Sequence, residues 1–302
     1  MRLPALSIGY AVPETSFDAT VHSVFQSTVN LTLGNGSLIA LLASDRTDLP
    51  HGIGLKTPDE FSFEQQGVVE KAVAVCRAEI LRIAGTSLII DLRGAARWQA
   101  HLDRVFVDMS RSESRRAWQT AFDALARHPE TARAIAGVAL LITQGALVDA
   151  VASLALGAEP SVNALMMSTQ RNDVYSATRA ARELVGLGPG LTPSGDDFLV
   201  GYLAGLWVTV GNDQQRAEFV RGFAGKIREL ATSANDISRA YLVDVSQAEV
   251  SGLIAGLIRA IGEETRQDAI REAALAAMNV GKTSGADGVA GLLLGLIAWQ
   301  NF

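Results

Sequence analysis

A run of glycines and prolines that leads directly into an apolar segment constrains the fold of this chain more than any other stretch. It spans residues 185–205 and reads VGLGPGLTPSGDDFLVGYLAG. Its glycines permit backbone conformations that other residues avoid, and its prolines stiffen the turns between them. Ser194 stands where a helix N-cap is expected, and Asp197 follows at the three-residue spacing of a capping box. We therefore predict a stiff loop that ends at the start of a buried helix.

The same device recurs near the C-terminus, where residues 282–296 read KTSGADGVAGLLLGL. Ser194 corresponds to Ser284 and Asp197 to Asp287, whereas the position of Asp196 is taken by Ala286 in the second copy. Two glycines four residues apart follow in each copy, Gly201 and Gly205 in the first and Gly291 and Gly295 in the second. Because this spacing leaves one helix face almost bare, we predict two helices packed glycine face to glycine face, with both N-termini directed at one site. The alternative is two buried helices with similar caps and no shared ligand.

A helix N-terminus presents unpaired N–H groups and a partial positive charge, which together favour a bound phosphate or carboxylate. The predicted anion-binding residues are Gly188, Gly190, Thr192, Ser194, Gly195, Asn235, Lys282, Thr283, Ser284 and Gly285. Bare carboxylates at Asp196 and Asp197 would repel an anion, so they must cap the helix, carry a proton or hold a divalent cation such as Mg²⁺. Asp196, Asp197 and Asp287 are the candidate catalytic residues, and Asp196 and Asp197 are the candidate metal ligands. In the alternative interpretation, Ser194 and Asp197 only cap a helix.

The composition argues against several classes of function. The formal net charge is −6 and Lys and Arg form no runs, which argues against a nucleic-acid-binding or anionic-membrane surface. The single cysteine, Cys76, permits no intramolecular disulfide, and the first residues do not resemble a signal peptide. Polar residues interrupt each apolar stretch before it reaches the length of a membrane span. We therefore expect a cytoplasmic protein that does not act on membranes or nucleic acids.

Secondary-structure signals divide the chain into two parts. Residues 21–33 and 37–43 are rich in β-branched and apolar residues and predict a hairpin around the turn at residues 34–36. Two or three further strands are expected within 68–83 and 87–92, although the composition of 68–83 fits a helix equally. This series of short strands fits a small closed or half-closed β-barrel.

Beyond residue 93, apolar residues recur at three- and four-residue spacing, which predicts helices. The predicted ranges are 95–102, 112–127, 131–142, 147–156, 161–169, 174–184, 214–230, 235–243, 249–261 and 266–278, in addition to the two helices that follow the glycine loops. The predicted fold class is therefore α+β, with a β-barrel-like N-terminal domain over residues 1–95 and a larger all-α domain over residues 96–302.

Four segments together closely resemble a bacterial family first described as a domain of unknown function and now associated with the AllH-like subunit of oxamate carbamoyltransferase. They are residues 186–201, the Val-Asn-Leu segment around Asn30, the Ile-Ser-x-x-Tyr-Leu segment from Ile237 and the C-terminal Thr-Ser-Gly-x-Asp. The resemblance implies carbamoyl transfer between oxalurate and phosphate, giving oxamate and carbamoyl phosphate during anaerobic use of allantoin as a nitrogen source. It also implies that the chain works with two other subunits and meets a small anionic substrate. No catalytic residue is carried over from the family.

Two other classes of function remain open. One is a non-catalytic structural or regulatory subunit, whose glycine faces serve assembly with other subunits or with copies of itself. The other is a Mg²⁺-dependent phosphotransferase. The Gly281-Lys282-Thr283 segment gives that class little support, because a P-loop needs a glycine where this chain has Ala276.

Overall fold

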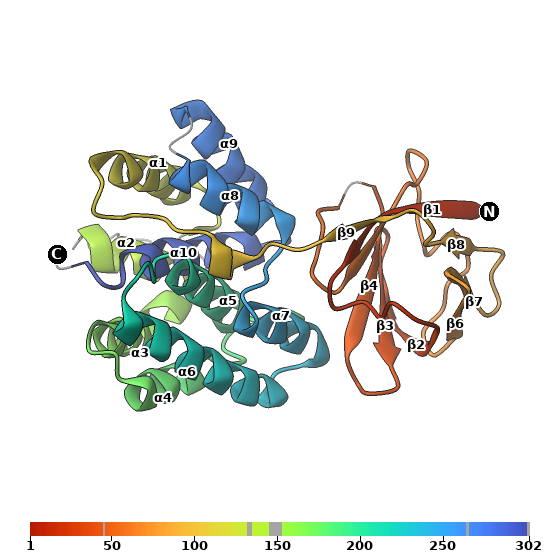
Figure 1. Cartoon of the computed structure of the whole chain (residues 1–302), viewed down its shortest axis with the longest axis horizontal. Coiled ribbons are helices and arrows are strands. Elements are labelled where there is room, and N and C mark those ends of the chain that lie inside the picture. The colour runs from red at the N-terminus through yellow and green to blue at the C-terminus, as the bar shows by residue number, and fades with distance from the viewer. Residues whose placement is uncertain (45, 132–134, 145–152, 264–265, 301–302) are drawn as a thin grey trace. The chain divides into compact units, whose positions relative to one another are not determined.

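The computed structural model describes residues 1–44, 46–131, 135–144, 153–263 and 266–300 (Figure 1). The chain splits into two compact units, Met1–Ala100 and His101–Phe302. The first unit is built of strands and the second of helices, so the predicted α+β class is confirmed. The predicted domain boundary after residue 95 lies immediately before a short strand, β9 (Ala96–Trp98), which is part of the first unit.

The first unit is a closed barrel of short strands. Their order around the barrel is β5 (Gly52–Leu55), β4 (Leu38–Leu42), β3 (Thr28–Leu33), β2 (Phe17–Val24), β6 (Val73–Arg77), β7 (Ile80–Ile83), β8 (Ile89–Asp91) and β1 (Arg2–Gly9). An antiparallel pairing of β1 with β5, in which Ala5 lies opposite Leu55, closes the ring. Strand β9 pairs in parallel with the second half of β1. Closure gives the edge strands partners, and it confirms the predicted barrel.

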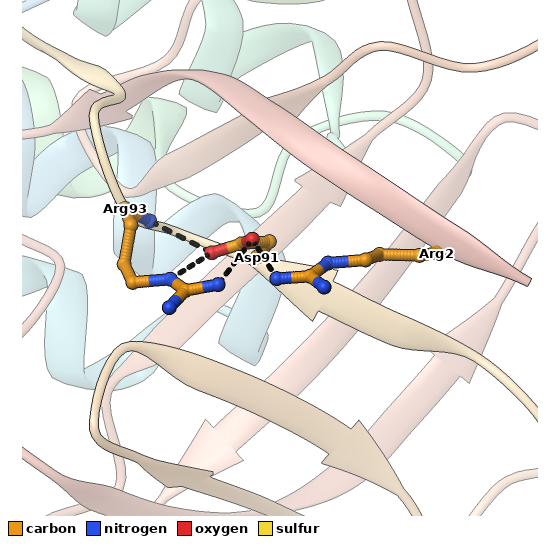
Figure 2. A network of polar contacts seen from close by, with 3 residues as sticks. All are labelled: Arg2, Asp91 and Arg93. Atoms are coloured by element: carbon orange, nitrogen blue, oxygen red, sulfur yellow. Dashed lines mark hydrogen bonds and ion pairs between the residues drawn. The ribbon is translucent and has the colours of Figure 1, made fainter.

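The Asp91 carboxylate at the end of β8 is hydrogen-bonded to the start of β1 and so links these two strands, as Figure 2 shows. Its carboxylate accepts hydrogen bonds from Arg93, at 2.8 Å from Nε and 2.9 Å from Nη2, and from Arg2 at the start of β1. These hydrogen bonds, first from Arg93 and then from Arg2, hold the pKa of Asp91 well below its usual range. The carboxylate is therefore ionised at neutral pH, and all of its strong partners come from the barrel itself.

Two expectations for the barrel are corrected by the structure. Residues 21–33 do not form one strand, because the chain turns after β2 and the Phe25 amide donates to the Thr28 carbonyl at 2.8 Å before β3 begins. The helical alternative for residues 68–83 is wrong, because β6 and β7 form a hairpin there whose turn residues, Ala78 and Glu79, have positive φ angles of 48° and 60°. The predicted hairpin around residues 34–36 is confirmed by the pairing of β3 with β4.

The second unit is helical. Its α-helices are α1 (Ser112–Arg127), α2 (Ala136–Gln144), α3 (Ser153–Gln170), α4 (Val174–Leu184), α5 (Ser194–Trp207), α6 (Gln214–Leu230), α7 (Asp236–Ser246), α8 (Gly252–Gly262), α9 (Gln267–Met278) and α10 (Ser284–Ile297). The helices predicted over 112–127, 174–184 and 214–230 have the same bounds in the structure. The other predicted bounds shift by up to five residues where the two can be compared.

Three helix predictions have a different outcome. Residues 95–102 are not helical, because β9 pairs there with β1 and His101 adopts a left-handed backbone with a φ of 54°. The prediction over 147–156 falls mostly outside the described residues, and its last four residues begin α3. That helix continues through the segment 161–169, which was expected to be separate.

Helices α5 and α10 lie side by side at the centre of the helical unit (Figure 1). Helices α1, α2 and α9 pack on α10, while α4, α6 and α7 pack on α5. All residues of α10 after Ser284 are buried, as expected for a helix that is apolar on every side. The rest of the unit is therefore a shell around this pair.

The glycines bring the two central helices into backbone contact. A Cβ on Gly201 would lie 1.9 Å from the carbonyl oxygen of Gly288, and a Cβ on Gly291 would lie 2.0 Å from that of Phe198. These two contacts are related by the same offset of 90 residues that relates the two sequence motifs. Positions advance together along both helices, so the pair is parallel and has an approximate twofold axis between the helices. The predicted glycine-to-glycine packing is confirmed.

We predict that Gly291→Ala destabilises the chain by about 3 kcal/mol or more, because the added methyl group overlaps a backbone oxygen that cannot move independently of its helix. Chemical denaturation measures the change in the free energy of unfolding. Gly225→Ala in α6 is the matched control, since its Cβ would meet no atom within 4 Å and alanine favours a helix by about 1 kcal/mol over glycine. Equal stability of the two variants would contradict the packing.

Candidate functional site

The two glycine-loop motifs meet in space. The hydroxyl oxygens of Thr192 and Ser284 are 2.7 Å apart, although the residues are separated by 92 positions in the sequence. Because α5 and α10 are parallel, their N-termini lie at the same end of the pair. The predicted convergence of the two helix starts is confirmed, and the ligand expected there stays a prediction.

The loop before α5 takes its shape from glycines in the left-handed region. Gly186, Gly188 and Gly190 have φ angles of 74°, 112° and 101°. Gly188 lies tightly against the start of the helix, because a Cβ there would be 2.9 Å from the amide nitrogen of Ser194. Gly190 is exposed, and nothing lies within 4 Å of where its Cβ would be. Gly186 is likewise exposed, with nothing within 4 Å of where its Cβ would be, so both of these glycines border open space.

Part of the predicted anion cradle is already occupied by the chain itself. The amide of Gly195 donates to the Leu187 carbonyl at 2.9 Å, and the amides of Asp196 and Asp197 donate to the Pro193 carbonyl at 2.9 and 3.2 Å. The N–H groups of Gly195, Asp196 and Asp197 are therefore not free donors. An anion at this position would depend on the hydroxyl groups and on the loop before the helix.

Gly195 and Gly285 have a packing function that explains their repetition. A Cβ on Gly195 would lie 1.9 Å from the carbonyl oxygen of Leu184, at the end of the preceding helix α4. A Cβ on Gly285 would lie 2.3 Å from that of Ala277 in α9. Each glycine thus allows the start of a central helix to pass close to the helix that precedes it.

The remaining predicted binding residues differ in access. Lys282 is exposed, Thr192, Thr283 and Ser284 are half-buried, and Ser194 is buried. The side chain of Asn235 caps α7 by accepting hydrogen bonds from the amides of Ile237 and Ser238, both at 3.0 Å.

Ser238, which the sequence offers together with Asn235 as a polar group that could complete the pocket, reaches the site. Its hydroxyl lies 3.5 Å from the Leu191 carbonyl oxygen of the glycine loop and hydrogen-bonds the Asp196 carboxyl. The only sequence signal for it was its place in a polar segment between the two motif copies. Asn235 therefore contributes indirectly, by ordering the first turn that carries Ser238.

Three carboxyl groups lie at the two helix starts. Asp287 Oδ1 accepts a hydrogen bond from the Ala136 amide, and Asp196 Oδ1 accepts one from the Gly186 amide, both at 2.9 Å. Asp197 is hydrogen-bonded to the hydroxyls of Ser284 and Thr192. The Oδ2 atoms of all three carboxyls are buried and have no hydrogen-bond partner among the described residues. The cluster therefore retains unused hydrogen-bonding capacity.

Hydroxyl contacts to these acids cross between the helices. Ser284 of α10 bonds Asp197 of α5, and Ser194 of α5 bonds Asp287 of α10, as the approximate twofold axis requires. The predicted capping box is wrong, because Pro193 occupies the N-cap of α5 and no side chain caps that helix. Each serine instead bonds the aspartate of the other motif, which ties the two helix starts together.

Burial raises the pKa of all three carboxyls. The pKa of Asp287 rises to about 7, that of Asp196 rises, and that of Asp197 lies well above its usual range. For Asp197, burial is the largest cause; repulsion from Asp287 and Asp196 adds to it, and the hydroxyl hydrogen bonds of Ser284 and Thr192 oppose it. Burial in this cluster therefore favours the protonated form of each carboxyl more than water does.

A metal ion at this site finds no support in the arrangement of side chains. In the described part of the chain, no three or more His, Cys, Asp or Glu side chains are grouped so that they could hold a metal ion. Of the three ways to accommodate the acids, a bound proton fits the structure best, and the Mg²⁺ site at Asp196 and Asp197 stays a prediction.

One cavity of the helical unit lies away from these residues. It has a volume of about 530 Å³ and is lined by residues that include Phe106, Trp207 and Asn212, beyond the C-terminal end of α5. None of the predicted site residues lines it. Within the described segments, none of the helices combines the length and the apolar character needed to cross a membrane.

Two family models match the chain in the regions that carry this architecture. Residues 4–97 match the AllH family N-terminal domain, and residues 184–296 match the family described as oxamate carbamoyltransferase subunit AllH. The first match spans nearly all of the barrel and the second spans both glycine-loop motifs. The chain is thus an α+β protein with a β-barrel unit and a helical unit built on paired helix starts. It belongs to the AllH family. No match was found among curated proteins or among solved structures.

We predict that Asp287 makes the chain less stable as the pH rises. Its pKa of about 7 exceeds the value of about 3.9 in an unfolded chain, so the folded state binds more protons between these pH values. The free energy of unfolding therefore falls across this interval, and Asp287→Asn should reduce the fall by about 4 kcal/mol. Chemical denaturation of both proteins at a series of pH values measures the free energy of unfolding and therefore this difference.

Asp173→Asn is the control for this experiment. Hydrogen bonds from Ser176 lower the pKa of Asp173 at the start of α4, so its contribution to stability is lost only as the pH falls below the usual range of an aspartate. This variant should leave the decline between about pH 4 and about pH 7 unchanged. A decline that is equally steep in Asp287→Asn would show that Asp287 is ionised in the folded chain.

Proposed function

We propose that this chain is a carbamoyltransferase subunit that binds carbamoyl phosphate, oxamate or oxalurate where α5 and α10 begin. Membership of the AllH family supports the subunit role and the presence of other subunits as partners. The observation that supports the site is the 2.7 Å contact between the hydroxyls of Thr192 and Ser284, one from each motif. We place this function in the cytoplasm, in the anaerobic use of allantoin nitrogen.

The chemistry of the site suits a carbamoyl compound. Attack on a carbamoyl carbon develops negative charge on its oxygen, and a phosphate group must be held as nucleophile or leaving group. The hydroxyls of Thr192, Thr283 and Ser284 can donate hydrogen bonds to such oxygens, and exposed Lys282 supplies a positive charge beside them. A proton on Asp197 removes the repulsion that a carboxylate would exert on the anion.

A structural or regulatory subunit is the second candidate function. It is favoured by the amides of Gly195, Asp196 and Asp197, which are used within the chain and do not face a ligand. In that case the glycines serve packing alone, and the chemistry takes place on another subunit.

Calorimetric titration of the chain with carbamoyl phosphate, oxamate and inorganic phosphate tests the proposed site. Thr192→Val and Ser284→Ala should each weaken binding about ten- to a hundredfold, because each leaves a charged ligand oxygen without its donor. Thr178→Val is the matched control, since its hydroxyl bonds only the Val174 carbonyl within α4. Affinity that is unchanged in the first two variants would place the ligand elsewhere.

Carbamoyl transfer by the reconstituted subunits separates the two candidate functions. If the chain carries the substrate site, the Thr192→Val variant should assemble with its partners and yet show a lower rate of transfer. Full activity of the partners with this assembled variant would instead assign the chain a structural or regulatory role.

A further inference from the structure

The cavity of about 530 Å³ lies at the opposite end of α5 from the two helix starts. Its walls are the segment 103–106, the end of α5 with the loop that follows it, and residues of α6. Because α5 has 14 residues, about 20 Å separates the cavity from the proposed substrate site. The volume lies within the range of about 300–1,000 Å³ that is typical of sites for small organic molecules.

The segment 103–106, which forms one wall, is held at both of its ends. The amides of Leu102 and Val107 donate to the backbone carbonyls of Ala248 and Val208, at 3.0 and 2.7 Å. The second of these hydrogen bonds fixes the segment directly beside the end of α5. This wall is therefore formed before any ligand binds.

Two aromatic rings face the cavity in fixed positions. The indole N–H of half-buried Trp207 donates to the Val245 carbonyl at 2.9 Å, which orients the ring and uses its only donor. The Phe106 side chain is 56% exposed, although its ring lies so close to Gly211 that a Cβ there would be 2.8 Å from Phe106 Cε2. Both rings thus offer a ligand flat apolar surface.

The cavity also carries positive charge that the chain leaves unused. Arg104 and Arg221 both line it and are exposed, and neither guanidinium has a hydrogen-bond or ion-pair partner among the described residues. Asp103 is the one acid among the described residues of the lining. The cavity therefore has two positive charges against one negative, whereas the chain as a whole has a net charge of −6.

We infer that this cavity is a second ligand site, which binds a small organic anion with a flat ring. The phosphate or carboxylate of such a ligand pairs with the guanidinium groups of Arg104 and Arg221, each of which can donate two parallel hydrogen bonds. Its ring packs on Trp207 and Phe106. An inorganic anion would leave the aromatic surfaces uncovered, and a neutral ring would leave both charges unpaired.

Two kinds of molecule share this chemistry, a nucleoside phosphate and an aromatic carboxylate. Adenosine monophosphate and benzoate are the probes, and calorimetric titration of the full chain measures their affinities. Tighter binding of adenosine monophosphate assigns the site to a nucleoside phosphate, and tighter binding of benzoate assigns it to an aromatic carboxylate. Either result supports the site, provided that binding depends on the residues of the cavity.

That dependence is measured with variants of the cavity. Arg104→Gln and Arg221→Gln should each weaken binding of the tighter probe about tenfold or more, because each removes a charge-assisted hydrogen bond. Phe106→Leu should weaken it by a similar factor, because the ring loses a stacking partner. Arg228→Gln is the matched control, since Arg228 is exposed on the same helix as Arg221 and does not line the cavity.

The inference and the proposed function fail separately. Thr192→Val should leave the affinity for the probe unchanged, and Arg221→Gln should leave the affinity for carbamoyl phosphate unchanged, because the two sites lie at opposite ends of α5. Thermal melting checks that each variant is folded. The inference is overturned if neither probe binds the wild-type chain. It is also overturned if binding persists undiminished in folded Arg104→Gln and Arg221→Gln, whatever the outcome for carbamoyl phosphate.

Discussion

The structure of the helical unit depends on one close approach, the backbone contact of α5 with α10. Glycines at matching positions of both helices allow carbonyl oxygens of one helix to occupy the space that side chains of the other would need. Two buried, apolar helices at this separation exclude water and fix their relative register to within one residue, because a shift would place a side chain against a backbone oxygen. The surrounding helices then pack on the outer faces of a pair whose geometry is already set.

The polar cluster at the helix starts follows from that register. Ser194 and Ser284 lie where each reaches the aspartate of the opposite motif, so the crossed hydroxyl contacts are a consequence of the parallel pairing. The same packing removes the carboxyls from water and leaves their second oxygens unpaired. A buried group of this kind costs stability unless it gains a proton or a partner, and such groups are concentrated at functional sites.

The sequence predicted the features that depend on spacing along one helix and failed on those that depend on partners distant in sequence. The glycine spacing was sufficient to predict the paired helices, and apolar periodicity located helices such as α1, α4 and α6 to the residue. The capping box at Ser194 failed, because the local spacing of a serine and an aspartate does not reveal that each has a better partner on another helix. The short strand β9 was taken for a helix, because its pairing with β1 is invisible to local periodicity.

The twofold relation between the motifs does not extend to their acids, because the first copy has the buried Asp196 where the second has the buried Ala286. The two helix starts have similar backbones but unequal polar groups, because the carboxyl of Asp196 and the Ser238 hydroxyl lie at the first motif only. A ligand with two different ends, such as an acyl group and a phosphate, would therefore make different contacts in its two possible orientations. The repeated motif places two similar helix starts side by side, and the difference between Asp196 and Ala286 makes the polar groups around them unequal.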